Sequence, residues 1–307
     1  MDIFVTLLIN LVPLYVLIGI GFIAGKFFEV DRDTLANLAI FVMLPIVVFG
    51  FVVDLEFQAS FLILPVVLYA VQAIIGLGFL AFGRAVYNGP EANILAMSAS
   101  MGNTGYFGLP LALMLFTPEQ VAIYIFMMIG GTVYEATIGY YIAARGRFNV
   151  RDSLIKLVKF PSIYAIILAL SVNASNVEMP EQFYTYWGYF KGAYVVIGMM
   201  IIGAALAKID RLAVCPRFLT LAFLGKFVGW PGLVLAYIMV DKLYLQMFDT
   251  EIYNLMLVMS IVPPAANIVA FAAQLNLVPE KAATTILLST VFALFYIPAV
   301  LIVMGIN

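Results

Sequence analysis

Long apolar runs, separated by short clusters of polar and charged residues, dominate this sequence. A helix needs roughly 20 apolar residues to cross the hydrocarbon core of a bilayer. Runs of this kind predict ten membrane-spanning helices, near residues 4–25, 35–53, 61–83, 91–114, 119–143, 160–178, 190–207, 217–239, 252–274 and 282–304. The polar and aromatic segment 173–187 between the sixth and seventh runs suits an interfacial loop. The pattern therefore predicts an all-α polytopic membrane protein.

Two of these spans are interrupted in the middle. The fourth contains Gly-Asn-Thr-Gly-Tyr-Phe-Gly-Leu-Pro at residues 102–110, and the ninth contains Pro-Pro-Ala-Ala-Asn at residues 263–267. Glycine and proline destabilise a helix interior. Backbone groups left unpaired in lipid cost several kcal/mol each, unless they are buried in protein or face a watery cavity. Each interruption therefore predicts a ligand site.

The two interruptions occupy corresponding places in the two halves of the chain. Asn103 precedes a Pro-Glu turn at residue 118 by the same distance as Pro264 precedes one at residue 279 (118 − 103 = 279 − 264 = 15). A basic loop at 144–159 divides the spans into repeats of five, residues 1–143 and 160–307. An odd number of spans per repeat inverts the second relative to the first, and paired interruptions in inverted repeats indicate a transporter's binding site.

The lysine and arginine residues predict the orientation of the chain. Those in loops after odd-numbered spans are Lys26, Arg32, Arg84, Arg145, Arg147, Arg151, Lys156, Lys159, Lys208, Arg211, Arg217 and Lys281. The loops on the other side hold only Lys191 and Lys242, and Lys226 lies inside the eighth span. By the positive-inside rule the basic loops are cytoplasmic. Both termini should then face outward from the cell membrane, and the first run, which lacks a positive leader, should be a permanent span.

Composition restricts the chemistry. Hydrophobic residues make up 65% of the chain and charged residues 10%, whereas soluble domains are nearer a quarter charged. One cysteine excludes an internal disulfide framework, and the absence of histidine removes imidazole from any metal site or general-base scheme. No G-x-S-x-G or H-E-x-x-H motif occurs. We therefore expect no enzymatic activity, no cofactor or metal, and no nucleic-acid partner.

Two broken helices that meet near the membrane midplane favour an anion. Each half-helix N-terminus presents unpaired N–H groups and the positive end of its dipole, and Asn103 and Asn267 add amides. A small carboxylate would fit such a site without a buried arginine, and no arginine lies inside a predicted span. The half-helix C-termini favour a cation or a proton-bearing group.

Two ionisable residues lie inside predicted spans. A charged side chain in the membrane costs free energy, so such residues are candidates for a functional role. Glu135 is midway along the fifth span, and Lys226 is in the eighth. If they meet, they form either an ion pair in place of a sodium ion, a proton relay in which Glu135 titrates, or a plain structural pair.

The interruption at 102–110, together with Pro264-Ala265-Ala266-Asn267 and the Leu44-Pro45 break, resembles the auxin efflux carrier family in its compact prokaryotic form. The resemblance covers essentially the whole chain. It implies a fold in which spans 1, 2, 6 and 7 form a scaffold, spans 3–5 and 8–10 form a moving transport domain, and spans 4 and 9 cross at their breaks. It also implies transport of organic anions such as malonate, malate or auxin.

The resemblance also suggests roles for individual residues. The expected substrate-binding residues are Asn103, Thr104, Gly105, Tyr106, Asn267, Ile268 and Met43. Pro110 and Pro264 mark the expected crossover, whereas the candidates for ion coupling are Glu135, Lys226 and Gln72. Some plant members have a carboxylate where this chain has Gln72, which weakens the case for a proton site there.

The expected function is therefore elevator-type secondary transport of a small mono- or dicarboxylate. A sensor that binds an anion at the same crossover without net transport is the alternative. A channel is disfavoured because no rings of charge and no repeated filter sequence occur. The driving force is left open between protons, sodium and the membrane potential. Small-residue pairs such as Gly21 and Gly25 allow close helix approach, either for sliding or for a homodimer through the scaffold helices.

Overall fold

The computed structural model describes residues 3–144, 155, 158–208, 211–275 and 277–306, and this part of the chain is helical apart from loops and one isolated β-bridge. Seven helical stretches are long and apolar enough to cross a membrane: Ile3–Phe27, Arg32–Val52, Ala59–Val86, Pro118–Ala143, Glu181–Ala207, Pro216–Leu245 and Pro279–Met304. The apolar helix α10 (Pro161–Ala174) is shorter, and most of the expected basic loop 144–159 lies outside the described residues.

Several of these stretches are composite. The elements are α1 (Ile3–Phe27), α2 (Arg32–Leu38), η1 (Ala39–Met43), α3 (Leu44–Val52), η2 (Ala59–Leu62), α4 (Ile63–Val86), α5 (Glu91–Ser100), η3 (Thr104–Gly108), α6 (Leu109–Leu115), α7 (Pro118–Tyr134), η4 (Glu135–Gly139), α8 (Tyr140–Ala143), α10, α11 (Glu181–Ala207), α12 (Pro216–Leu224), η5 (Gly225–Gly229), α13 (Trp230–Val240), η6 (Asp241–Leu245), α14 (Thr250–Ser260), α15 (Asn267–Gln274) and α16 (Pro279–Met304). Short π-helical turns η1, η3, η4, η5 and η6 interrupt the α-helices, and such turns are frequent at functional sites.

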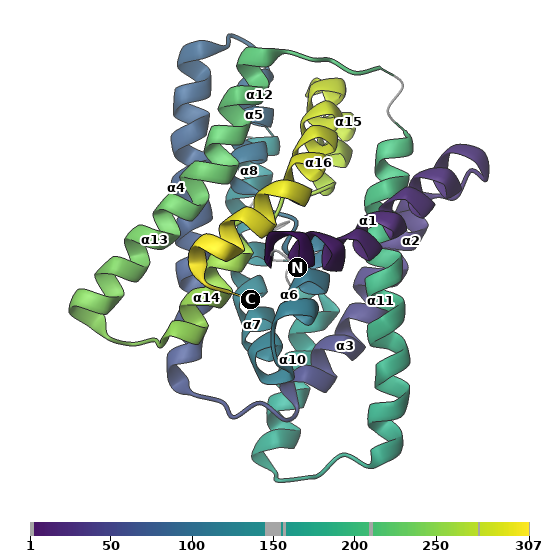
Figure 1. Ribbon diagram of the computed structural model, residues 1–307, viewed down its shortest axis with the longest axis vertical. Coiled ribbons are helices and arrows are strands. Elements are labelled where there is room, and N and C mark those ends of the chain that lie inside the picture. The colour runs from purple at the N-terminus through teal and green to yellow at the C-terminus, as the bar shows by residue number, and fades with distance from the viewer. Residues whose placement is uncertain (1–2, 145–154, 156–157, 209–210, 276, 307) are drawn as a thin grey trace.

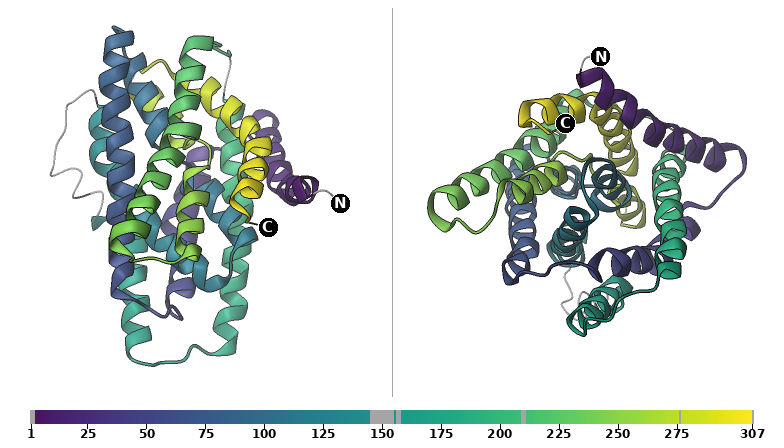
Figure 2. Two further views of the ribbon diagram at one scale, coloured as in Figure 1. Left: turned by 60° about the vertical axis from the view of Figure 1, so that its left-hand side comes forward. Right: turned by 60° about the horizontal axis from the view of Figure 1, so that its bottom comes forward.

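Several helices pack in side-by-side pairs (Figures 1 and 2). Helix α1 lies along α11, and α3 lies along α10. Helix α4 packs against α5 and α7, and α12 packs against α5. Glycine permits the close contact between α1 and α11, because a Cβ added to Gly203 of α11 would overlap the backbone of Ile18 in α1. The interrupted helix that contains α6 lies in the middle of the molecule, with the long helices around it (Figure 2, right).

The two interruptions meet. Helix α5 ends at Ser100 and α14 ends at Ser260, and the extended segments that follow form an antiparallel bridge between Gly102 and Pro264. The backbone N–H of Asn103 donates to the Pro263 carbonyl at 2.8 Å, and the N–H of Ala265 donates to the Met101 carbonyl at 2.9 Å. Each broken helix thus supplies the backbone partners that the other lacks.

Two local expectations are wrong. Pro110 is not at the break, because the break lies at Gly102, whereas Pro110 follows the π-helical turn η3 inside the half-helix that begins at Thr104. The segment up to residue 187 is not an interfacial loop throughout, because α11 already begins at Glu181. Trp187 lies within that helix, where its indole N–H donates to the Val47 carbonyl at 3.2 Å and its ring packs edge-on against Phe51.

Candidate functional site

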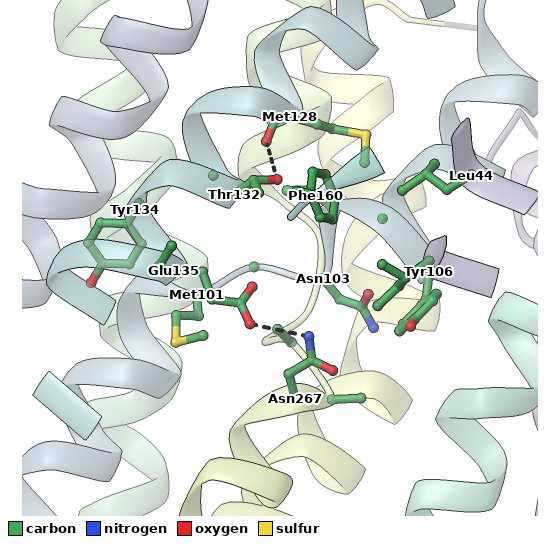
Figure 3. Close-up of a pocket in the computed structure, with 18 of the residues that line it drawn as sticks. Leu44, Met101, Asn103, Tyr106, Met128, Thr132, Tyr134, Glu135, Phe160 and Asn267 are labelled. Atoms are coloured by element: carbon green, nitrogen blue, oxygen red, sulfur yellow. Dashed lines mark hydrogen bonds between the residues drawn. The ribbon is translucent and has the colours of Figure 1, made fainter. Parts of the chain in front are cut away.

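A cavity of about 440 Å³ lies beside the bridge, between the crossing segments, the α7–η4 helix and the η1–α3 helix. Its walls include backbone or side chains from both interruptions: Met101, Gly102, Asn103, Thr104, Gly105, Tyr106, Ala265, Ala266 and Asn267. Figure 3 shows Asn103 and Asn267 facing this cavity from different segments of the chain. Apolar side chains such as Leu44, Met128 and Phe160 complete the walls.

Asn103 caps the half-helix that begins with η3. Its Oδ1 accepts the N–H of Phe107 at 3.3 Å, and its backbone carbonyl accepts the N–H of Gly108 at 2.8 Å. Because the oxygen of the amide serves the helix N-terminus, the amide NH₂ is the group left for the cavity. The residues that follow, Gly105 and Tyr106, are in the first turn, where backbone N–H groups lack partners within the helix.

Asn267 lies at the N-terminus of α15 and joins two charged side chains. Its Oδ1 accepts a hydrogen bond of 2.7 Å from Nη2 of Arg32, and its Nδ2 donates to Oε1 of Glu135 at 3.3 Å (Figure 3). Arg32 is only 8% exposed, and its Nη1 also contacts Asp33 at 2.8 Å. The result is a chain of alternating donors and acceptors that runs from α2 through α15 to η4.

Local sequence explains how Arg32 comes to begin a helix. Asp31 is the N-cap of α2 and accepts the backbone N–H of Thr34 at 2.9 Å, so Arg32 is the first helical residue. The hydrogen bonds from Thr34 hold the pKa of the exposed Asp31 carboxyl below its ordinary value, which keeps the cap ionised at neutral pH. The negative charge of this cap is also stabilised by the positive end of the helix dipole.

The structure does not pair Glu135 with Lys226, because no ion pair joins them within the described residues. Lys226 is completely buried behind the bridge. Its Nζ donates to the Ser260 carbonyl at 3.2 Å and lies 3.2 Å from the ring centroid of Trp230. The ammonium thus faces the C-terminal end of α14, which is the end whose dipole favours a cation.

The other expected site residues divide into two groups. Thr104, Gly105, Tyr106 and Gln72 line the cavity. Met43 and Ile268 are absent from its lining, and Ile268 is fully buried. Ile268 follows Asn267 by one helical position, which turns its side chain about 100° around α15 and into the core.

Sequence reasoning missed several lining or neighbouring residues. Arg32 reads in the sequence as one more flanking charge, and Lys159 as part of a basic loop, yet Lys159 lies at the cavity and Arg32 contacts Asn267. A signal for Arg32 was present in the Asp-Arg-Asp-Thr cap, which places it inside the helix that follows. Thr132 and Phe160 carried no comparable signal.

The described residues of the site offer hydrogen-bond donors and charge. It combines amide NH₂ groups, first-turn backbone N–H groups and a nearby guanidinium with one carboxylate, that of Glu135. Within the described part of the chain, no group of three or more His, Cys, Asp or Glu side chains is placed to hold a metal ion. The donors and the carboxylate can form hydrogen bonds with a small polar molecule.

Comparison with known proteins identifies the class of protein to which the chain belongs. The chain is 25% identical over 294 residues to an uncharacterized transporter of Methanocaldococcus jannaschii, which covers 92% of this chain and 94% of that protein. It is also 25% identical over 197 residues to an uncharacterized transporter of Methanothermobacter thermautotrophicus, covering 62% of this chain and 65% of the relative. A family model described as membrane transport protein matches residues 6–301. The chain therefore belongs to this family of membrane transporters, that of the auxin efflux carriers.

Proposed function

We propose that the protein is a secondary transporter that carries a small mono- or dicarboxylate across the cell membrane by an elevator-type movement. The observation that supports this best is the pairing of Gly102 with Pro264 at the wall of a cavity of about 440 Å³. A cavity of this size matches a small-molecule site. The helices that start there, from Thr104 and from Asn267, direct first-turn N–H groups toward it.

The charges around the cavity agree with an anion. Lys159 lies at its edge, and Arg32 contacts Asn267 directly behind its wall. Among the described residues, Glu135 is the one carboxylate that lines it, and Asn267 donates to that group. A carboxylate solute can replace Glu135 as the acceptor for the Asn267 amide, or bind beside a protonated Glu135. The second route makes a proton the proposed coupling ion, with sodium as the alternative.

The packing supports an elevator. The first, second, sixth and seventh expected spans correspond to α1, α2–α3, α10 and α11, which pack on one another. The remaining spans contain both interruptions, and the two backbone hydrogen bonds of the bridge tie them into one body. We assign the first group as the scaffold and the second as the transport domain, each built from both of the inverted repeats, residues 1–143 and 160–307. The cell membrane, with both termini outside, is the proposed location.

The first test is thermal stabilisation of the purified protein by malonate, malate, acetate and indole-3-acetate, at two pH values and with or without sodium. A ligand that binds only the folded state raises apparent stability by RT ln(1 + [L]/Kd). We expect one carboxylate class to raise the melting temperature. A flat response to the whole panel would contradict a carboxylate transporter.

The amides are tested by substitution. Asn103→Ala and Asn267→Ala should abolish carboxylate uptake into proteoliposomes, because each removes a donor to a charged group, worth about 1.5–3 kcal/mol. Asn103→Asp separates binding from capping, because it keeps the acceptor for the Phe107 N–H but replaces the NH₂ donor with a negative oxygen. It should fold normally and still lose uptake. Asn37→Ala, at an exposed position of α2, is the matched control.

Uptake also separates a carrier from a sensor. A carrier shows saturable uptake and accelerated exchange when unlabelled carboxylate is loaded inside the vesicles. A protein that is stabilised by a carboxylate but shows neither flux nor exchange would be a sensor.

A further inference from the structure

We propose that Arg32 is a positioning residue, which fixes the orientation of the Asn267 amide and so determines the carboxylate affinity of the site. This inference rests on the proposed function and deepens it. Arg32 does not line the cavity of about 440 Å³; it acts through Asn267, whose Oδ1 it holds at 2.7 Å.

The argument starts from hydrogen-bond polarity. A guanidinium can only donate, and an ionised carboxylate can only accept. Asn267 lies between Arg32 and Glu135, so one orientation of its amide satisfies both neighbours, with Oδ1 toward Arg32 and Nδ2 toward Glu135. The amide therefore presents its NH₂ group to the cavity. Without Arg32, Glu135 alone orients the amide, through a single bond of 3.3 Å, so the amide can more easily turn its carbonyl oxygen toward the cavity, where it would repel a carboxylate.

Burial makes this constraint strong. Arg32 is 8% exposed, and an arginine in such surroundings retains its charge. Loss of its charge-assisted hydrogen bond to Asn267 would therefore cost free energy, because little water reaches the guanidinium to replace the bond. Asp33 accepts from Nη1 at 2.8 Å and so holds the guanidinium plane in place.

The two partners belong to different bodies of the proposed elevator. Arg32 begins α2 in the scaffold, and Asn267 begins α15 in the transport domain. A displacement of one body along the other must break the 2.7 Å bond. The Asn267 amide is then oriented by Arg32 on one side of the membrane only, which makes the carboxylate affinity different in the two states of the carrier.

A second cavity gives access to Arg32 from the opposite side. It has a volume of about 610 Å³ and is lined by Arg32, Asp33, Lys208, Arg211, Gln274 and Glu280, among others. Ala266 lines both cavities, so the chain that contains Asn267 forms the wall between them. A small solute in the larger cavity can therefore reach the place that the Arg32 side chain vacates in a truncated variant.

The first experiment measures carboxylate affinity by thermal stabilisation, with the member of the panel that stabilises the wild type. Arg32→Ala should weaken apparent affinity about tenfold, the loss of one charge-assisted contact. Arg32→Lys retains a donor and should lose less. Lys208→Ala is the matched control, because it removes a cation from the same larger cavity without a contact to Asn267.

A double-mutant cycle separates positioning from simple attraction between charges. If Arg32 acts through Asn267, Arg32→Ala weakens carboxylate affinity in the wild type and has no further effect in the Asn267→Ala background. A general electrostatic contribution persists in both backgrounds. Equal effects of Arg32→Ala in the two backgrounds would overturn the proposal.

Chemical rescue provides a readout that a merely structural role would not move. Guanidinium at non-denaturing concentration should restore carboxylate affinity to Arg32→Ala, whereas tetramethylammonium, which has the same charge and no N–H, should not. Rescue by both ions, or by neither, contradicts the proposal. If no carboxylate stabilises the wild type, the proposed function and this inference fail together; a normal wild type with an unchanged Arg32→Ala variant overturns the inference alone.

Discussion

At the residue scale, buried charges in this protein are placed against helix ends. Lys226 has 0% exposure and donates to the last carbonyl of α14, and Arg32 begins α2 and reaches the first residue of α15. Within the described residues, no ion pair joins Lys226 to a carboxylate, and the Asp33 partner of Arg32 is exposed. The carbonyl end of α14 and the Trp230 ring therefore take the place of a counter-ion for Lys226. Arg32, which lies at helix N-termini whose dipoles oppose a cation, relies instead on Asn267 and Asp33.

Substitution of Lys226 should show how much its contacts contribute to the free energy of unfolding. Lys226→Met keeps most of the volume but leaves the Ser260 carbonyl without its donor, and it should lower the free energy of unfolding by about 1–3 kcal/mol. Lys226→Ala adds a cavity and should cost about 2–5 kcal/mol. Apparent melting temperatures in detergent measure both. Lys191→Met, at a partly exposed lysine over the Trp187 ring, is the control and should change little; equal losses for Lys191 and Lys226 would contradict this account.

At the element scale, π-helical turns account for much of what the sequence did not predict. The apolar runs predicted an all-helical membrane protein, and the two interruptions marked the segments that meet at Gly102 and Pro264. The register of side chains around each helix was less accessible. Turn η1 adds a residue to the turn before α3, so Leu44 rather than Met43 faces the cavity. The contact of Arg32 with Asn267 depends on where α15 lies, which no local pattern encodes.

The α1–α11 contact gives a test at this scale. Gly203→Ala should destabilise the protein, because the new Cβ would overlap backbone atoms of Ile18 and Phe22, which side-chain rotation cannot relieve. Gly192→Ala on the same helix is the matched control, because nothing lies within 4 Å of its added Cβ. It should be neutral or stabilising by up to about 1 kcal/mol through helix propensity. Similar melting temperatures for the two variants would mean that α1 and α11 are not packed in this way.

At the scale of the whole molecule, two connections that differ in charge lie far apart. The start of α12 and the α10–α11 connection lie at opposite ends of the long axis in Figure 1. The sequence places the first among the basic loops and the second on the side that is poor in lysine and arginine. Orientation in the membrane is a property of charge rather than of packing, so the fold alone does not decide it.

The single cysteine makes the orientation measurable. Cys215 is the N-cap of α12 and is partly exposed. We expect a membrane-impermeant maleimide to label it in inside-out vesicles and to leave it unlabelled in intact cells. A Cys215→Ser protein that carries Ser175→Cys, in the exposed α10–α11 connection, should show the reverse. Labelling of Cys215 from outside would invert the proposed topology.

The bridge between Gly102 and Pro264 also has a consequence for biogenesis. The Met101 carbonyl and the Asn103 N–H come from the first half of the chain, and their partners come from the ninth expected span. During synthesis, these groups enter the membrane long before residues 263–265 leave the ribosome. Until then, these two backbone groups of the fourth expected span lack their partners, and water, lipid headgroups or the insertion machinery must shield them. Completion of the solute site is consequently among the last events of membrane assembly.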